Sequence, residues 1–330
     1  MRKGLGILIT LLLATSCYRE MVLEVPGSPE GLLVNAQLST ADQSHSVFVG
    51  LSSSSRVLRL HSVEVSCSVN GGDRIIAEDV LSGGRLQAEY RFNASLEPGD
   101  RLSIGVKDAE GRTAGAEVTV PELSGEIISI DTSSVGGKVY FSIKLRNNRE
   151  GRNYYMLTLD KYFRAHLDDI NPNNGSTFTF LSEGVRKCLR LSYDSDAVLS
   201  GGYIGDAGEN DVIGTGIENV NCVFSNARFI DDIATVKVYV DSTSLYGDEI
   251  VDYYISGVKD NSAIVSLHSI SKQEYDYLWA LNSLQVSGFH ISDMMEPVSI
   301  PMNVSGGYGF VSASSCSSMR VGLKRQFLKR

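Results

Sequence analysis

Hydrophobic and polar residues alternate along several short stretches between residues 31 and 121. The clearest stretches hold Val47, Val49 and Leu51; Val63, Val65, Cys67 and Val69; Leu102, Ile104 and Val106; and Ala114, Ala116, Val118 and Val120. A period of two is typical of strands that bury one face, and turns rich in Gly, Asn and Asp separate these stretches. The pattern predicts an immunoglobulin-like β-sandwich over residues 31–121.

A second β-rich region is predicted over residues 122–330. Its alternating stretches include Val139, Phe141, Ile143 and Leu145; Val236, Val238 and Val240; and Ala263, Val265 and Leu267. Residues 194–221 are rich in Gly, Asp and Asn, which predicts a long surface loop, and such loops often hold binding sites. We therefore expect a mainly β fold, in which the sandwich precedes a larger antiparallel β domain with long loops.

One helix is predicted near residues 271–285. Ser271 and Glu274 have the S-x-x-E spacing of a capping box, and apolar residues then recur at helical spacing. These apolar residues are Tyr277, Leu278, Leu281 and Leu284. Trp279, the only tryptophan, lies in the same helix, where it either packs against the core or a domain interface or contacts a partner.

The first seventeen residues have the layout of an export signal. Arg2 and Lys3 precede an apolar stretch, residues 5–14, of the length expected in a signal peptide. This stretch is too short to cross a bilayer, which needs roughly 20 residues. Thr15 and Ser16 then lead directly to Cys17, an arrangement that resembles the lipobox of bacterial lipoproteins.

The lipobox resemblance implies cleavage before Cys17 and attachment of lipid to this residue. Residues 1–16 are then a lipoprotein signal peptide, and residues 17–30 form a tether that holds the body at a membrane. The alternative is an ordinary secretory signal in which Cys17 has no special role.

The net charge argues against a nucleic acid as partner. The chain has a formal charge of −9, and residues 1–16 contain two basic residues and no acidic one. Their removal makes the mature chain still more acidic, whereas proteins that bind phosphate backbones carry basic surfaces.

The remaining cysteines and histidines predict neither a metal site nor a catalytic site. Four cysteines follow the lipobox, and they allow three disulfide pairings that the sequence does not distinguish. They are Cys67, Cys188, Cys222 and Cys316. Their long spacings contain no zinc-binding pattern, and the five histidines are scattered, without a metalloprotease motif or a nucleophile-elbow serine nearby. We expect no cofactor and no enzymatic activity.

Several motifs, in order along the chain, resemble a family of Bacteroidota outer-membrane lipoproteins known as domain of unknown function 4249. Gly31–Asn35 is similar to the opening strand of this family, and the helix Tyr275–Leu284 is similar to its tyrosine-rich helix. Glu296–Val298 and Asn303–Phe310 resemble its E-P-V step and its glycine-rich ending. Val223–Asn226 resembles an F-S-D motif, except that Asn226 replaces the acid.

This resemblance implies a lipid-anchored protein of the outer membrane, displayed at the cell surface or on the periplasmic face. Genes of this family often neighbour those of TonB-dependent outer-membrane transporters, which implies an accessory binding protein that helps to take up an unknown ligand. Two alternatives remain open. Tandem β-sandwiches behind a lipobox also resemble fimbrillin-like structural or adhesive subunits, and a cell-envelope hydrolase could assemble its carboxylates from distant positions.

Overall fold

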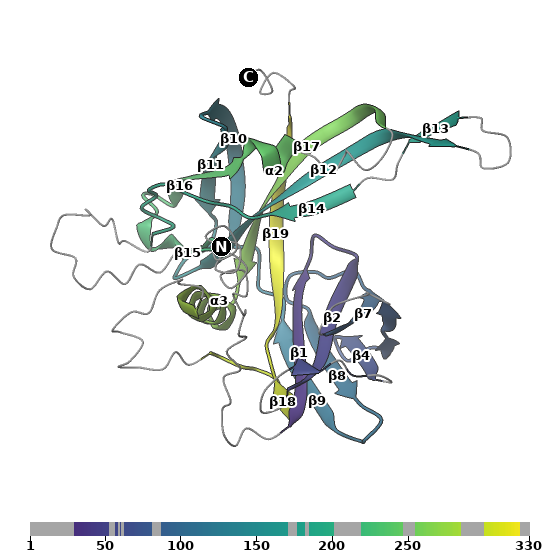
Figure 1. Ribbon diagram of the computed structural model, residues 1–330. Helices are drawn as coiled ribbons and strands as arrows, with labels where there is room; N and C mark the ends of the chain where they lie inside the picture. The colour runs from purple at the N-terminus through teal and green to yellow at the C-terminus, as the bar shows by residue number, and fades with distance from the viewer. Residues whose placement is uncertain are drawn as a thin grey trace, which may run out of the picture.

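The computed structural model has two lobes built on one large β-sheet (Figure 1). The structure describes residues 30–52, 57–58, 60, 63–80, 87–170, 177–181, 185–200, 219–246, 255–284 and 300–323. Cys17 and the Glu296–Val298 motif lie outside the described residues, and so does most of the predicted loop 194–221.

The first lobe is a two-layer β-sandwich, as the alternating pattern predicts. Its strands are β1 (Gly31–Ser39), β2 (Ser44–Ser52), β3 (Val57–Leu58), β4 (Glu64–Val69), β5 (Ile75–Ile76), β6 (Glu78–Val80), β7 (Ala88–Asn93), β8 (Arg101–Lys107) and β9 (Thr113–Thr119). One layer holds β1, β2, β7 and β6, and the other is the sheet β5-β4-β8-β9. Leu102, Ile104 and Val106 of β8 are buried between the layers, while the residues between them face outward.

The second lobe is also mainly β and includes the predicted helix. Its elements are β10 (Gly125–Val135), β11 (Lys138–Asn147), β12 (Tyr154–Ile170), β13 (Thr177–Leu181), β14 (Val185–Leu189), β15 (Val223–Ser225), η1 (Asn226–Arg228), β16 (Ile233–Asp241), α2 (Ser242–Tyr246), β17 (Ile255–Ile270), α3 (Lys272–Leu284), β18 (Gly307–Tyr308) and β19 (Val311–Gly322). The sheet β10-β11-β16 packs on β12, β17 and β19 around Phe141, Tyr155 and Val265. The mainly β fold class is therefore confirmed.

Strand β19 joins the two lobes. Residues 311–314 pair in parallel with β1, and residues 315–322 pair antiparallel with β17. The strand, yellow in Figure 1, thus makes one sheet continuous from β13 to β6. Val304, Val311 and Ala313 pack in the core of the first lobe. The division of the chain at residue 121 stays a prediction, to which the structure adds that the C-terminal segment completes the first lobe.

The glycine-rich ending explains how this segment reaches β1. Gly309 has φ +112°, and a Cβ there would collide with the carbonyl oxygen of Val34. Asn35 accepts a hydrogen bond from the Phe310 amide at 3.1 Å, and Asn303 exchanges two hydrogen bonds with the Val311 backbone. The opening strand and the glycine-rich ending, which lie at opposite ends of the resemblance, therefore contact each other.

Helix α3 begins and ends within one residue of the prediction. The Ser271 hydroxyl accepts a hydrogen bond from the Glu274 amide at 3.1 Å, so Ser271 caps the helix as predicted. The carboxyl group of Glu274, however, bonds to Ser312 in β19. Trp279 is partly buried and stacks on Tyr275, with ring centroids 6.1 Å apart, which supports the packing alternative. Within the described residues, we find no helix with the length and apolar character to cross a membrane.

Candidate functional site

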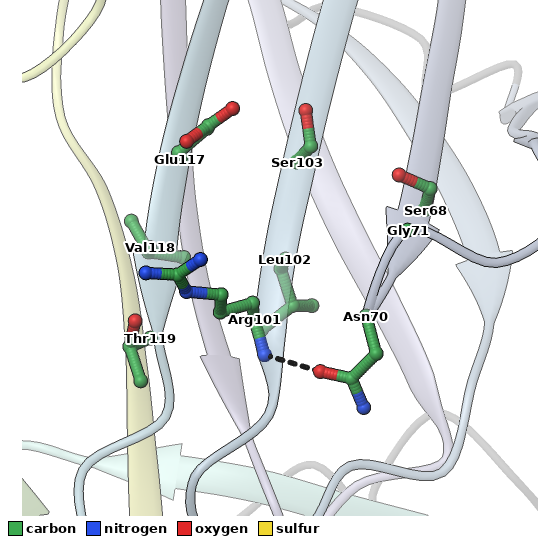
Figure 2. Close-up of a pocket in the computed structure, with 9 residues that line it drawn as sticks. All are labelled: Ser68, Asn70, Gly71, Arg101, Leu102, Ser103, Glu117, Val118 and Thr119. Carbon is green, nitrogen blue, oxygen red and sulfur yellow. Dashed lines mark hydrogen bonds between the residues drawn. The ribbon is translucent and has the colours of Figure 1, made fainter.

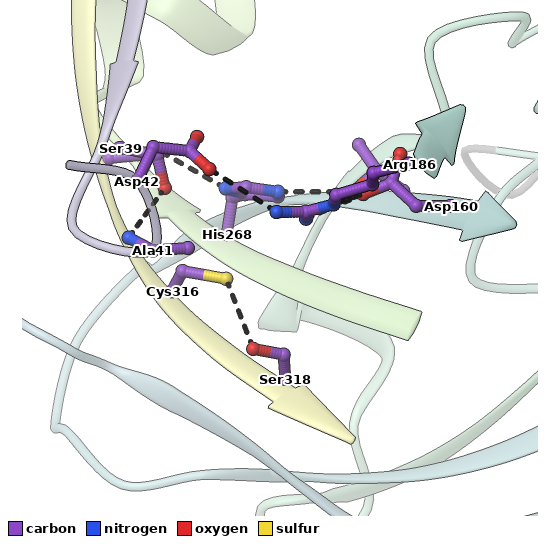
Figure 3. Close-up of polar contacts among 10 residues, drawn as sticks. Ser39, Ala41, Asp42, Asp160, Arg186, His268, Cys316 and Ser318 are labelled. Atoms are coloured by element: carbon purple, nitrogen blue, oxygen red, sulfur yellow. Dashed lines mark hydrogen bonds and ion pairs between the residues drawn. The ribbon is translucent and has the colours of Figure 1, made fainter. Parts of the chain in front are cut away.

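One candidate site is a buried polar seam where β19 passes from one lobe to the other. Alternate residues Ser312, Ser314 and Cys316 share the face of β19 that points away from the two cores. We call these residues, with His268 and Thr158 beside them, the β19 seam. Figure 3 shows His268 at the centre of its polar contacts.

His268 is held neutral in the β19 seam. Its Nδ1 lies 3.1 Å from the Ser314 hydroxyl and its Nε2 lies 3.1 Å from the Thr158 hydroxyl. The residue is 8% exposed, and burial lowers the pKa of its imidazole to about 4. A general base works best with a pKa near the working pH and with access to a substrate proton, so this histidine is poorly placed for catalysis.

An ion-pair cluster beside His268 connects the lobes. Arg186, on β14, donates from Nε to the buried Asp160 carboxylate at 2.5 Å. The same guanidinium donates to Asp42, in the turn between β1 and β2, at 3.2 Å (Figure 3). Arg186 and Asp42 are both well exposed, so their pair contributes at most about 1 kcal/mol. It is a contact between the two lobes.

The four cysteines of the described residues are free thiols. Cys67 lies in the core of the first lobe and Cys222 in the core of the second. Cys188 and Cys316 lie on β14 and β19, which β12 and β17 separate, so three strand spacings of about 4.8 Å keep them too far apart for a disulfide. The pKa of the Cys67 thiol is raised to about 11 by burial, which makes it a poor nucleophile.

A second candidate is an open hollow on the outer face of the sheet β5-β4-β8-β9 (Figure 2). It has a volume of about 560 Å³ and is lined by Ser68, Asn70, Gly71, Arg101, Leu102, Ser103, Glu117, Val118 and Thr119. The sheet builds it because outward positions on three neighbouring strands are polar and mostly small. In the described part of the chain, the side chains of Arg101 and Glu117 have no ion-pair partner. The hollow therefore offers a cation, an anion and several hydroxyl groups to a ligand.

On a third polar surface, which lies on the sheet β10-β11-β16, the polar side chains contact one another. Lys138 lies 3.8 Å from the centre of the Tyr239 ring and 3.1 Å from Asp194. Tyr140 donates a hydrogen bond to the same Asp194 carboxylate at 2.9 Å. Because these groups bind one another, they offer less to a ligand than the hollow does.

Asn226, which replaces the acid of the family motif, has a structural role. Its Oδ1 accepts a hydrogen bond from the Asn153 amide at 3.0 Å, and its Nδ2 donates to the Gly151 carbonyl at 2.8 Å. An ionised carboxylate makes only the first of these two bonds. Within the described ranges, no group of three or more His, Cys, Asp or Glu side chains is arranged to hold a metal ion.

The fold and these surfaces define a two-lobed, mainly β protein with open polar sheet faces. The chain belongs to the family described as domain of unknown function DUF4249, whose model matches residues 18–320. No curated protein matches the sequence.

Two solved structures resemble the fold only distantly. A DUF4785 family protein from Legionella pneumophila has a TM-score of 0.23 at 10% identity, and the match covers 72% of this chain and 52% of that protein. The adhesin InvE of Yersinia pseudotuberculosis has a TM-score of 0.20 at 10% identity, with 72% and 55% covered. The chain thus spans about half the length of these two proteins, and at such TM-scores they support no argument about its function.

Proposed function

We propose that this chain is a lipid-anchored outer-membrane binding protein that acts as an accessory to a TonB-dependent transporter and performs no catalysis. The contrast between the two candidate sites carries this proposal. His268 is buried and neutral, whereas the hollow presents Arg101 and Glu117 on an open face, without an ion-pair partner among the described residues. Such a surface can recognise a partner but holds no activated nucleophile or base.

The N-terminus supports attachment to a membrane through Cys17. The family match begins at residue 18, directly after this cysteine, and β1 begins at Gly31. The intervening residues 17–30 reach at most about 50 Å when fully extended. A tether of this length keeps the first lobe, which bears the hollow, close to proteins of the same membrane.

The hollow is the contact surface that we assign to the transporter. Charged groups that meet a complementary partner steer association and fix its register. Arg101 lies on β8 beside Ser103, and Glu117 lies on the neighbouring strand opposite Ser103. The opposite charges can each meet a counter-charge on the partner, while the hydroxyl groups between them provide hydrogen bonds.

Affinity purification of a tagged full-length chain from detergent-solubilised outer membrane tests this proposal. We expect recovery of a TonB-dependent barrel with the wild type, and a loss of at least tenfold with Arg101→Glu. Lys107→Glu is the matched control, because it makes the same charge change on the same face of β8, about 20 Å along the strand and outside the hollow.

Two further results separate the parts of the proposal. Cys17→Ala should abolish metabolic labelling with fatty acid and remove the protein from the outer-membrane fraction. Recovery of no barrel with the wild type would refute the transporter role, and equal losses for the two charge variants would refute the hollow as the contact.

A further inference from the structure

A second buried titratable group enters the β19 seam from helix α3. The Ser312 hydroxyl donates a hydrogen bond to Glu274 Oε1 at 2.8 Å. Glu274 is 1% exposed, and among the described residues its Oε2 has no hydrogen-bond partner. An ionised carboxylate in this position is costly, because burial removes water from a charge that receives only one hydrogen bond.

Glu274 and His268 are bound to alternate serines of one strand. Ser312 contacts Glu274 and Ser314 contacts His268. The two serines lie on the same face of β19, roughly 7 Å apart along the strand. Both serines are buried, and they belong to the part of β19 that pairs with β1, directly before the strand crosses to β17.

We propose that the β19 seam is a proton-balanced joint, by which we mean a contact between the lobes that requires Glu274 to be protonated and His268 to be neutral. In these states the two groups hold α3 and β19 to both lobes. Ionisation of either group places an uncompensated charge in the seam and weakens the packing there. This joint is independent of the proposed transporter role, since it concerns how the two lobes are held together.

The surroundings of Glu274 favour its protonated form. From β19 its carboxyl group meets Ser312, and its own backbone amide donates to the Ser271 cap. Further along α3, the Tyr277 ring stacks on Phe310, with ring centroids 4.2 Å apart. Burial raises the pKa of Glu274 to about 7, and the hydrogen bond from Ser312 opposes this only partly. The nearest charged groups on α3, Lys272 and Asp276, form an exposed ion pair with each other.

The surroundings of His268 favour its neutral form. Thr158 on β12 and Ser314 on β19 contact its two ring nitrogens. Burial is the main cause of its lowered pKa; Asp42 and Asp160 raise this pKa and Arg186 lowers it further. Because these three charged groups form their own cluster, they do not supply a close counter-ion for an imidazolium.

The contributions of the two groups to folding stability depend on pH in opposite directions. The folded state keeps a proton on Glu274 up to about pH 7, whereas the unfolded chain releases it near pH 4.5, so this contribution to stability is lost as pH rises between these values. The folded state keeps His268 neutral down to about pH 4, whereas the unfolded chain protonates near pH 6.5, so this contribution is lost as pH falls between these values. Between pH 4.5 and 6.5 the two effects cancel.

Urea unfolding of the full chain and two variants between pH 4.5 and 8 tests the joint. Relative to the wild type, the folding equilibrium constant of Glu274→Gln should rise about tenfold per pH unit from pH 4.5 to 7. That of His268→Gln should rise relative to the wild type by about tenfold per pH unit as the pH falls from 6.5 to 4.5, because the variant lacks the group whose protonation destabilises the wild type there. Asp276→Asn, an exposed change on the same helix, should follow the wild-type curve closely.

A direct titration keeps the proposal testable if a variant does not fold. In wild-type protein, NMR should show the Glu274 carboxyl carbon titrating near pH 7 and the His268 ring unchanged above pH 5. Ordinary values near 4.5 and 6.5, or variant curves parallel to the wild type, would overturn the joint.

Discussion

The β19 seam and the hollow are both polar surfaces built from β-strands, but they treat their polar groups in opposite ways. In the seam, each nitrogen of His268 contacts a hydroxyl group, and only 8% of the residue is exposed. In the hollow, Arg101 and Glu117 face solvent without an ion-pair partner in the described part of the chain. Polarity alone therefore does not identify a binding surface. What distinguishes the hollow is that its hydrogen-bonding capacity is still available.

The largest effect is expected from changing the glycine that brings the C-terminal segment to β1. Gly309→Ala should destabilise the protein by about 3 kcal/mol or more, because a positive φ is combined with a collision against the Val34 carbonyl. Gly111→Ala, in the turn between β8 and β9, also has a positive φ but open space around its Cβ, and should cost about 1–2 kcal/mol. If urea unfolding shows equal losses of stability for the two variants, the close approach to β1 contributes nothing to the cost at Gly309.

A threonine-to-valine change made in each region sharpens the comparison. Thr158→Val leaves one nitrogen of the buried His268 without its hydroxyl partner and should cost about 1–2 kcal/mol. Thr119→Val, in the hollow, removes an exposed hydroxyl and should change the free energy of unfolding by less than about 0.5 kcal/mol. A larger loss for Thr119→Val would contradict the distinction between the sealed and the open region.

The smallest effect is expected at the exposed ion pair between the lobes. Asp42→Asn should lower the free energy of unfolding by at most about 1 kcal/mol, since both partners are well exposed. High salt should reduce the difference in unfolding free energy between variant and wild type, because dissolved ions screen the attraction between the two exposed charges. A salt-independent loss of several kcal/mol would mean that Asp42 contributes through packing instead.

Local patterns predicted the strands and the helix because each depends on residues close together in the chain. The alternation of Leu102, Ile104 and Val106 correctly predicted the buried face of β8, and Ser271 correctly predicted the start of α3. The second half of the capping box is different in the structure, because the carboxyl group of Glu274 accepts a hydrogen bond from β19. A sequence pattern contains no information about a partner strand that arrives after a further 38 residues.

The β19 seam and the hollow were not predicted, because each assembles from separate strands. Thr158, His268 and Ser314 come from three strands, and Asp42 and Arg186 lie 144 residues apart. The sequence identified the glycine-rich ending only as a motif. The need for glycine at position 309 comes from its close approach to the Val34 carbonyl in the folded structure. For the hollow, the available signal was weak: polar, mostly small residues at the outward positions of β4, β8 and β9.

Photo-crosslinking in intact cells tests the central claim most directly. A photoreactive amino acid at position 119, in the hollow, should crosslink the full-length chain to the TonB-dependent barrel that we propose as its partner. The same group at position 113 serves as the matched control, because Thr113 is an exposed threonine on the same face of β9 but lies outside the hollow. A barrel adduct from position 119 and none from position 113 is the predicted result. Adducts from both positions, or from neither, would contradict the account.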